Sequence, residues 1–167
     1  RFLRMAKPKV YLTRRLPEPA ESLIKEVCEY EIWGEPWPIP REVLLEKVRG
    51  VSGILSLLTD RMDAEVMDAA GPDLKVISNY AVGFDNVDLD AAKARGITVT
   101  NTPGVLTETT ADLTWALLMA AARRIVEGDR FTRSGQWKGW DPLLFLGVDV
   151  YGKTLGIIGF GRIGVAV

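Results

Sequence analysis

The most chemically specific residues of this chain lie at its carboxyl end, where three glycines are spaced as G-x-G-x-x-G. They belong to the turn Gly159-Phe160-Gly161-Arg162-Ile163-Gly164, which follows the apolar run 154–158. In a dinucleotide-binding unit, the first glycine makes the turn and the second lets the backbone approach a pyrophosphate. The third lets the new helix pack closely on its strand. No G-K-[ST] follows, which argues against a P-loop. The pattern therefore predicts a strand over 154–158 and a dinucleotide-binding turn after it.

A second candidate site is the segment Ser78–Asn86, which follows a buried apolar run. Its place at the carboxyl end of a parallel strand is where open α/β sheets bind ligands. Gly83 permits a bend that would turn successive N–H groups toward a carboxylate. The alternative is an ordinary strand-to-helix loop in which Asp85, Asn86 and Asp88 cap the following helix. The residues alone favour this second interpretation.

Composition narrows the class of protein. The 167 residues are 47% hydrophobic with a net charge of -1, which is typical of a globular domain and gives no reason to expect a nucleic acid or membrane partner. The longest apolar stretch, 113–122, is about half of the ~20 residues that span a bilayer. Cys28 is the single cysteine, so no internal disulfide forms and a cytoplasmic location is expected.

The chain contains no histidine, so a mechanism that needs an imidazole cannot be completed within it. We expect no metal site. The charged residues at 1–4 are not followed by an apolar segment, so no signal peptide is expected, and Met5 is interpreted as the natural start.

Strands and helices alternate along the first hundred residues. We expect strands at 9–13, 30–33, 53–58, 74–78 and 97–100, and helices at 17–27, 41–48, 63–70 and 88–95. Asp63 is placed to cap the third helix, and Gly96 is placed to close the fourth. The apolar run 53–58 lacks the alternation of a half-exposed strand, which indicates burial on both sides. The pattern predicts an α/β fold: a parallel, flavodoxin-like or Rossmann-like sheet with helices on both faces, over a first domain at 7–102.

Residues 103–167 are expected to form a long helix, a loop arm, and the start of a second, truncated Rossmann domain. Thr109–Asp112 matches the [ST]-x-x-[DE] signal for a helix start, and the helix is expected to continue to about Val126. Its portion 113–122 is apolar nearly all round and must be buried by more than one surface. The tryptophan-rich segment 134–147 is expected to pack against a second subunit.

Three segments resemble the D-isomer-specific 2-hydroxyacid dehydrogenases, most closely their glyoxylate/hydroxypyruvate reductase branch. They are 79–88, 101–112 and 152–164, in the order of that family, and the resemblance covers residues 7–167. It implies an oxidoreductase that transfers a hydride reversibly from NAD(P)H to the carbonyl carbon of a small 2-oxo acid. It also implies that 7–102 is the substrate-binding (catalytic) domain. From the apolar segments of 103–167 we expect a homodimer.

The resemblance assigns roles to individual residues. The backbone amides of Val82 and Gly83 would bind the substrate carboxylate, and Leu58 and Tyr80 would form part of the pocket wall. On this basis the anion-binding interpretation of the 78–86 loop outweighs the ordinary loop. The implied contacts to NAD or NADP are Thr110, near the nicotinamide, together with Gly159, Phe160, Gly161, Arg162, Ile163 and Gly164.

The same resemblance places the catalytic residues outside this chain. The family uses an arginine that clamps the substrate and a histidine, backed by a carboxylate, that protonates the developing alkoxide. None of Arg123, Arg124, Arg130 and Arg133 occupies the matching motif, so no catalytic residue is expected here. We expect the amino-terminal half of such an enzyme, inactive in isolation, whose 113–122 helix and 154–158 strand dock on another copy or are poorly ordered. The alternative is a non-catalytic ligand-binding or assembly module of the same fold.

Overall fold

The computed structural model describes residues 6–167, so Met5 lies outside the described residues. The chain divides into two units, one ending at Pro103 (unit 1) and the other comprising Gly104–Val167 (unit 2). None of the helices in the described part combines the length and the apolar character needed to cross a bilayer.

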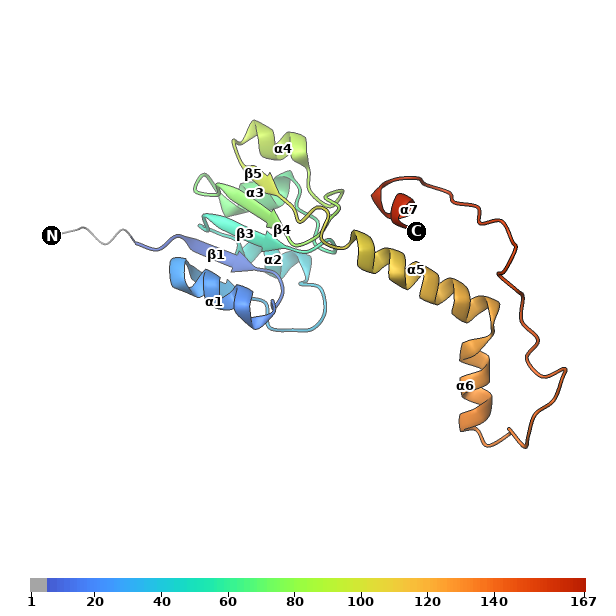
Figure 1. Ribbon diagram of the computed structural model, residues 1–167. Coiled ribbons are helices and arrows are strands. Elements are labelled where there is room, and N and C mark those ends of the chain that lie inside the picture. Colours follow the sequence, from blue (N-terminus) through green and yellow to red (C-terminus); the bar gives the residue numbers. More distant parts are fainter. Residues whose placement is uncertain (1–5) are drawn as a thin grey trace. The chain divides into compact units, whose positions relative to one another are not determined.

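Unit 1 is built around five parallel strands in the order β2-β1-β3-β4-β5. Figure 1 labels β1, β3, β4 and β5 of this sheet. This is the flavodoxin-like order, and it confirms the predicted parallel α/β sheet. The strand order reverses between β1 and β3, so the crevice outside the carboxyl ends of the strands is the expected ligand position. The strands are β1 (Lys9–Leu12), β2 (Glu29–Ile32), β3 (Gly53–Ser56), β4 (Val76–Asn79) and β5 (Thr98–Thr100).

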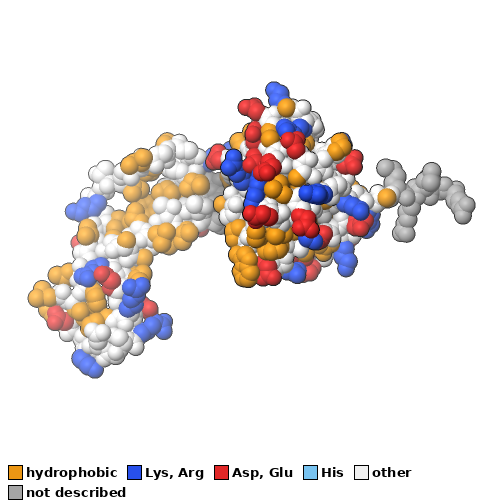
Figure 2. Space-filling view, turned by 180° about the vertical axis from the view of Figure 1, so that it is seen from behind, with side chains coloured by type: hydrophobic (Ala, Val, Ile, Leu, Met, Phe, Trp, Pro, Cys, Tyr) orange, Lys and Arg blue, Asp and Glu red, His pale blue; other side chains and the backbone are white. Residues whose placement is uncertain are grey.

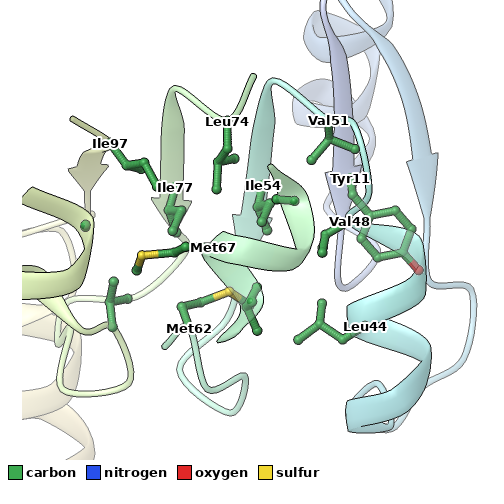
Figure 3. Packing of buried hydrophobic residues seen from close by; sticks show 14 of the residues in the cluster. Tyr11, Leu44, Val48, Val51, Ile54, Met62, Met67, Leu74, Ile77 and Ile97 are labelled. Carbon is green, nitrogen blue, oxygen red and sulfur yellow. The ribbon is translucent and has the colours of Figure 1, made fainter. Parts of the chain in front are cut away.

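Helices lie on both faces of this sheet, as the sequence predicted. Tyr11, Ile54 and Ile77 point from three strands into a core shared with α2, α3 and α4 (Figure 3). Neighbouring strand residues such as Val10 and Leu55 point to the opposite face, which α1 covers in part. The helices are α1 (Glu18–Val27), α2 (Arg41–Lys47), α3 (Ala64–Ala70) and α4 (Leu89–Ala94).

Two helices of unit 1 begin where the sequence predicts, because a local carboxylate caps each of them. Asp63 accepts a hydrogen bond from the amide of Val66 at the start of α3, and Asp88 accepts one from Ala91 at the start of α4. After α4, Gly96 has a φ of 66°, a left-handed conformation that suits glycine. These three signals need only short stretches of sequence, which is why they can be read without the fold.

The long helix of unit 2 begins and ends at other residues than expected. α5 is Thr107–Ala122 and its N-cap is Leu106, so the predicted capping start at Thr109 is wrong. The hydroxyls of Thr109 and Thr110 instead donate to the Leu106 carbonyl within the first turn of the helix.

The expected end at Val126 is also wrong. Arg124 adopts a left-handed φ of 55°, which terminates α5, and a separate helix α6 (Ile125–Arg133) follows. The Arg124 guanidinium pairs with Glu127 in the first turn of α6 and lies 5.1 Å from the centre of the Phe145 ring. A glycine after a helix is a recognisable sign that the helix ends, whereas an arginine gives no such sign. The break between α5 and α6 could therefore not be predicted from the sequence.

The strand predicted at 154–158 is not formed. No hydrogen-bonded neighbour is paired with it among the described residues, and a single extended segment gains no ladder bonds. Ile158 is fully exposed. The turn after it nevertheless opens a helix, α7 (Arg162–Ala166), which packs on α5.

Much of the surface of unit 2 is apolar. Leu113 and Leu117 of α5 are 57% and 61% exposed, and only Ala111 of that helix is buried. Hydrophobic side chains are spread over this unit in Figure 2. Docking of these residues on another copy of the chain stays a prediction.

Asp63 also predicts how stability depends on pH. Burial acts to raise the pKa of its carboxyl, but hydrogen bonds from Arg41 and the Val66 amide, with the charges of Arg41 and Arg61, hold the pKa below its usual value. The stabilisation is therefore present above the unfolded pKa of about 4 and is lost as the pH falls through the folded pKa. Asp63→Asn keeps a capping oxygen and should cost about 0.5–1 kcal/mol at pH 7.

Urea unfolding at pH 7 and at pH 3 checks this expectation, with the exposed Asp73→Asn as the control. The difference between Asp63→Asn and the unmodified chain should shrink at pH 3. An equal difference at both pH values would contradict it.

Candidate functional site

The candidate site of unit 1 consists of two loops at the carboxyl edge of the sheet. The β3 loop (57–62) follows β3, and the β4 loop (80–87) follows β4. β3 and β4 are hydrogen-bonded neighbours, so both loops leave the sheet side by side. The amide of Tyr80 continues the pairing by donating to the Ser56 carbonyl at 2.7 Å.

Three successive carbonyl groups of the β4 loop are held by donors of the protein. The Ala81 carbonyl accepts from the Thr102 amide at 2.9 Å. The Val82 carbonyl accepts from Asn101 Nδ2 at 2.8 Å, and the Gly83 carbonyl accepts from Asn79 Nδ2 at 2.9 Å. The donors come from the ends of β4 and β5, which pair with each other in the sheet.

This arrangement determines where the amides of the loop point. In a planar trans peptide the N–H is directed opposite to the C=O. Because the carbonyls of residues 81–83 are turned toward the protein, the N–H groups of Val82, Gly83 and Phe84 are turned away from those donors. Among the described residues none of these three amides has an acceptor, and all three residues are exposed. Successive free N–H groups are the chemistry of an anion site.

Two asparagines connect the β4 loop to the β3 loop. The side chains of Asn79 and Asn86 exchange hydrogen bonds of 3.0 and 3.1 Å. Asn86 Nδ2 also lies within hydrogen-bond distance of the carbonyls of Leu57 and Asp60, at 3.0 and 2.9 Å. Asn79 is fully buried, and its Oδ1 accepts from Ser56 Oγ.

A buried carboxylate holds the turn of the β3 loop from the other side. Asp60 is 3% exposed and accepts hydrogen bonds from Thr13 Oγ1 and from the amide of Leu57. The Arg14 guanidinium lies 3.9 Å from the same carboxylate, which offsets the cost of burying its charge. The turn is therefore fixed through its backbone on both sides.

The residues expected to form the pocket wall lie on these loops. Leu58 is at the tip of the β3 turn and is 65% exposed, and Tyr80 opens the β4 loop and is 49% exposed. The structure thus brings Leu58, Tyr80, Val82 and Gly83 to one edge of unit 1. Asp85, Asn86 and Asp88 were considered as caps of the following helix, and of these three Asp88 caps α4. Asn86 joins the two loops instead.

The glycine turn of unit 2 has the backbone that a pyrophosphate contact requires. Gly159 has a φ of 90°, and a Cβ on Gly164 would collide with the Gly159 carbonyl oxygen. A Cβ on Gly161 would meet no atom within 4 Å, so it would occupy the open space that a bound group needs. These glycines therefore fit the close approach of a dinucleotide. Phe160, Arg162 and Ile163 are exposed in the same turn, and their contact with a cofactor stays a prediction.

Thr110 lies in the first turn of α5, where its hydroxyl donates to the Leu106 carbonyl at 2.6 Å. It belongs to unit 2, as does the glycine turn. Both elements are tied together, because α7 packs on α5 and the indole N–H of Trp115 donates to the Val167 carbonyl. The contact of Thr110 with a nicotinamide stays a prediction.

Sequence reasoning missed the residues that hold the site. Asn79, Asn101, Thr102 and Asp60 had no predicted role, and Asn86 was considered only as a cap. One signal was present, because a polar Asn79 follows the strand expected at 74–78, and a buried amide must find partners. Those partners come from elements that are distant in sequence, so no local pattern names them.

Comparison with known proteins identifies the family. The family model for the D-isomer specific 2-hydroxyacid dehydrogenase catalytic domain matches residues 10–153. A glyoxylate reductase of Thermococcus gammatolerans is 59% identical over 165 residues, which cover 96% of this chain and 49% of that relative.

Solved structures agree with this match. A Thermus thermophilus protein gives a TM-score of 0.90 at 53% identity, over 95% of this chain and 50% of that one. An NADPH-dependent glyoxylate/hydroxypyruvate reductase of Sinorhizobium meliloti, in complex with NADP and malonate, gives 0.75 at 32% identity, over 96% and 49%. The chain spans about half the length of these relatives, and it belongs to the D-isomer specific 2-hydroxyacid dehydrogenase family.

Proposed function

We propose that this chain supplies the substrate-carboxylate site and part of the dinucleotide site of a reductase for small 2-oxo acids of the glyoxylate or hydroxypyruvate type. The observation that carries the proposal is the set of three outward-facing N–H groups of residues 82–84. The carbonyls of the same peptide groups, which belong to residues 81–83, are held by the protein. A carboxylate bound there would accept hydrogen bonds to a charged oxygen, which are stronger than neutral ones. The carbonyl group of the same acid would then extend from a fixed carboxylate.

The relatives support this choice of substrate. The Thermococcus protein is named a glyoxylate reductase, and the Sinorhizobium enzyme was crystallised with malonate, a small dicarboxylate, and with NADP. Either NAD or NADP would suit the glycine turn. When bound, the nicotinamide supplies a hydride to the substrate carbonyl carbon.

The residues of this chain would bind and orient the substrate and would not protonate it. The amides of residues 82–84 hold the carboxylate, while Leu58 and Tyr80 border the space beside it. The alkoxide that hydride addition forms needs a proton from a group such as histidine, and this chain contains none. We therefore place the proton donor outside these 167 residues. The proposal includes a cytoplasmic homodimer, which would bury the exposed apolar residues of α5.

A titration followed by NMR tests the carboxylate site. Adding oxalate, and separately glyoxylate, to the ¹⁵N-labelled chain should shift the amide signals of Val82, Gly83 and Phe84, because these N–H groups would acquire acceptors. The amide of Ala92, buried in α4, is the internal control and should not move. Saturable shifts elsewhere and none at residues 82–84 would rule out this site.

Turnover distinguishes an enzyme from a non-catalytic ligand-binding or assembly module. We expect the natural gene product that contains this sequence to oxidise NADH or NADPH with glyoxylate. We expect the 167 residues alone to show no turnover, because they lack the proton donor. Cofactor oxidation is followed at 340 nm. A gene product that binds oxalate but never consumes the cofactor would favour the module, and turnover by the isolated chain would contradict our placement of the proton donor.

Two glycine substitutions test the dinucleotide site in the same gene product. Gly161→Ala places its methyl group in open space, so the melting temperature should change little while the KM for the cofactor rises about tenfold or more. Gly164→Ala places its methyl group against the Gly159 carbonyl and should lower the melting temperature as well. An unchanged cofactor KM in Gly161→Ala would argue against a pyrophosphate at this turn.

A further inference from the structure

The side chains of Asn79 and Asn86 form a hydrogen-bonded amide pair at the carboxyl edge of the sheet. Asn79 donates to the Gly83 carbonyl and to Asn86, and it accepts from Ser56 and from Asn86. Both donor hydrogens and both acceptor positions of this fully buried amide are thus used. Such a group is stable in one arrangement only, because any displacement leaves a buried polar atom without a partner.

The two amides hold different parts of the site. Asn79 holds the Gly83 carbonyl and so directs the amide of Phe84 outward. Asn86 reaches the carbonyls of Leu57 and Asp60, which flank Leu58 and Thr59 at the tip of the β3 turn. One pair of side chains therefore joins the expected carboxylate site to an expected wall of the pocket.

The backbone alone already joins the bases of the two loops. The Met62 amide donates to the Asn86 carbonyl, and the Asp88 amide donates to the Met62 carbonyl. A further side-chain contact from Asn86 at the bases would therefore add little to the attachment of the two loops. The Asn86 side chain instead reaches the opposite end of the β3 turn, next to Leu58.

We propose that Asn86, held by Asn79, is a positioning residue that sets the separation between the Leu58 turn and the amides of residues 82–84, and thereby the size of the 2-oxo acid that is accepted. This inference rests on the proposed function. Asn86 does not touch the substrate and acts through the two loops. Hydroxypyruvate carries a hydroxymethyl group where glyoxylate has hydrogen, so the two substrates report on the space beside the carboxylate.

The test compares two variants of the natural gene product. Asn86→Ala removes the side-chain contact to the Leu57 and Asp60 carbonyls and leaves the β3 turn held by Asp60 alone. It should change the ratio of kcat/KM for glyoxylate and hydroxypyruvate by about fivefold or more, because small displacements at a site have large kinetic effects. Asn101→Ala releases only the Val82 carbonyl, so it should raise the KM for both substrates about tenfold and keep the ratio within about twofold. Ile77→Val, which removes one buried methyl group from β4, should lower the melting temperature without changing the ratio.

If Asn86→Ala does not fold, Asn86→Asp replaces it. The aspartate keeps the oxygen that accepts from Asn79 and loses the donor to Leu57 and Asp60. Its carboxylate oxygen would face the Leu57 and Asp60 carbonyl oxygens and repel them, so the β3 turn is displaced and the ratio should change in this variant as well. An unchanged ratio in a folded Asn86 variant overturns the inference.

The oxalate titration of the unmodified chain separates this outcome from a failure of the proposed function. Absence of shifts at residues 82–84 overturns both proposals. Shifts together with an unchanged ratio overturn only the role of Asn86. A changed ratio in the Asn86 variant, with the Asn101 and Ile77 variants behaving as expected, supports it.

Discussion

The candidate site depends on the geometry of the trans peptide, which directs a carbonyl and the following N–H in opposite directions. Unit 1 holds three successive carbonyls with Thr102, Asn101 and Asn79. The amides that follow them are consequently offered outward without a partner from the protein. No cationic side chain is needed to make this part of the loop attractive to an anion.

That geometry requires the parallel sheet. Asn79 ends β4, while Asn101 and Thr102 follow β5, and the pairing of β4 with β5 brings the donors to one edge. β3 on the other side contributes the turn that Asp60 and Asn86 hold. An unpaired buried polar group costs about 1–3 kcal/mol, so a cluster with all its bonds made resists rearrangement.

Unit 2 differs from unit 1, because its glycine turn is formed while the apolar residues around it are largely exposed. Its glycine turn has the required backbone, since Gly159 takes a left-handed φ and Gly164 has no room for a side chain. Around that turn, however, the apolar residues of 113–122 and 154–158 are largely exposed. Exposed apolar surface of this extent is typical of an interface. The backbone of the turn is therefore formed, while the apolar residues around it stay largely exposed.

The sequence by itself determined what short stretches of chain control: the alternation that predicts a parallel α/β sheet, the caps at Asp63 and Asp88, and the glycine turn. It misplaced both ends of α5, because neither the early start nor the left-handed Arg124 has a distinct local signal. It also predicted a strand at 154–158, which cannot form without a paired neighbour. Only the tertiary structure decided that Asn79, Asn101 and Asn86 hold the loops. Their partners lie on neighbouring strands and loops, and contacts between residues distant in sequence exist only once the sheet has formed.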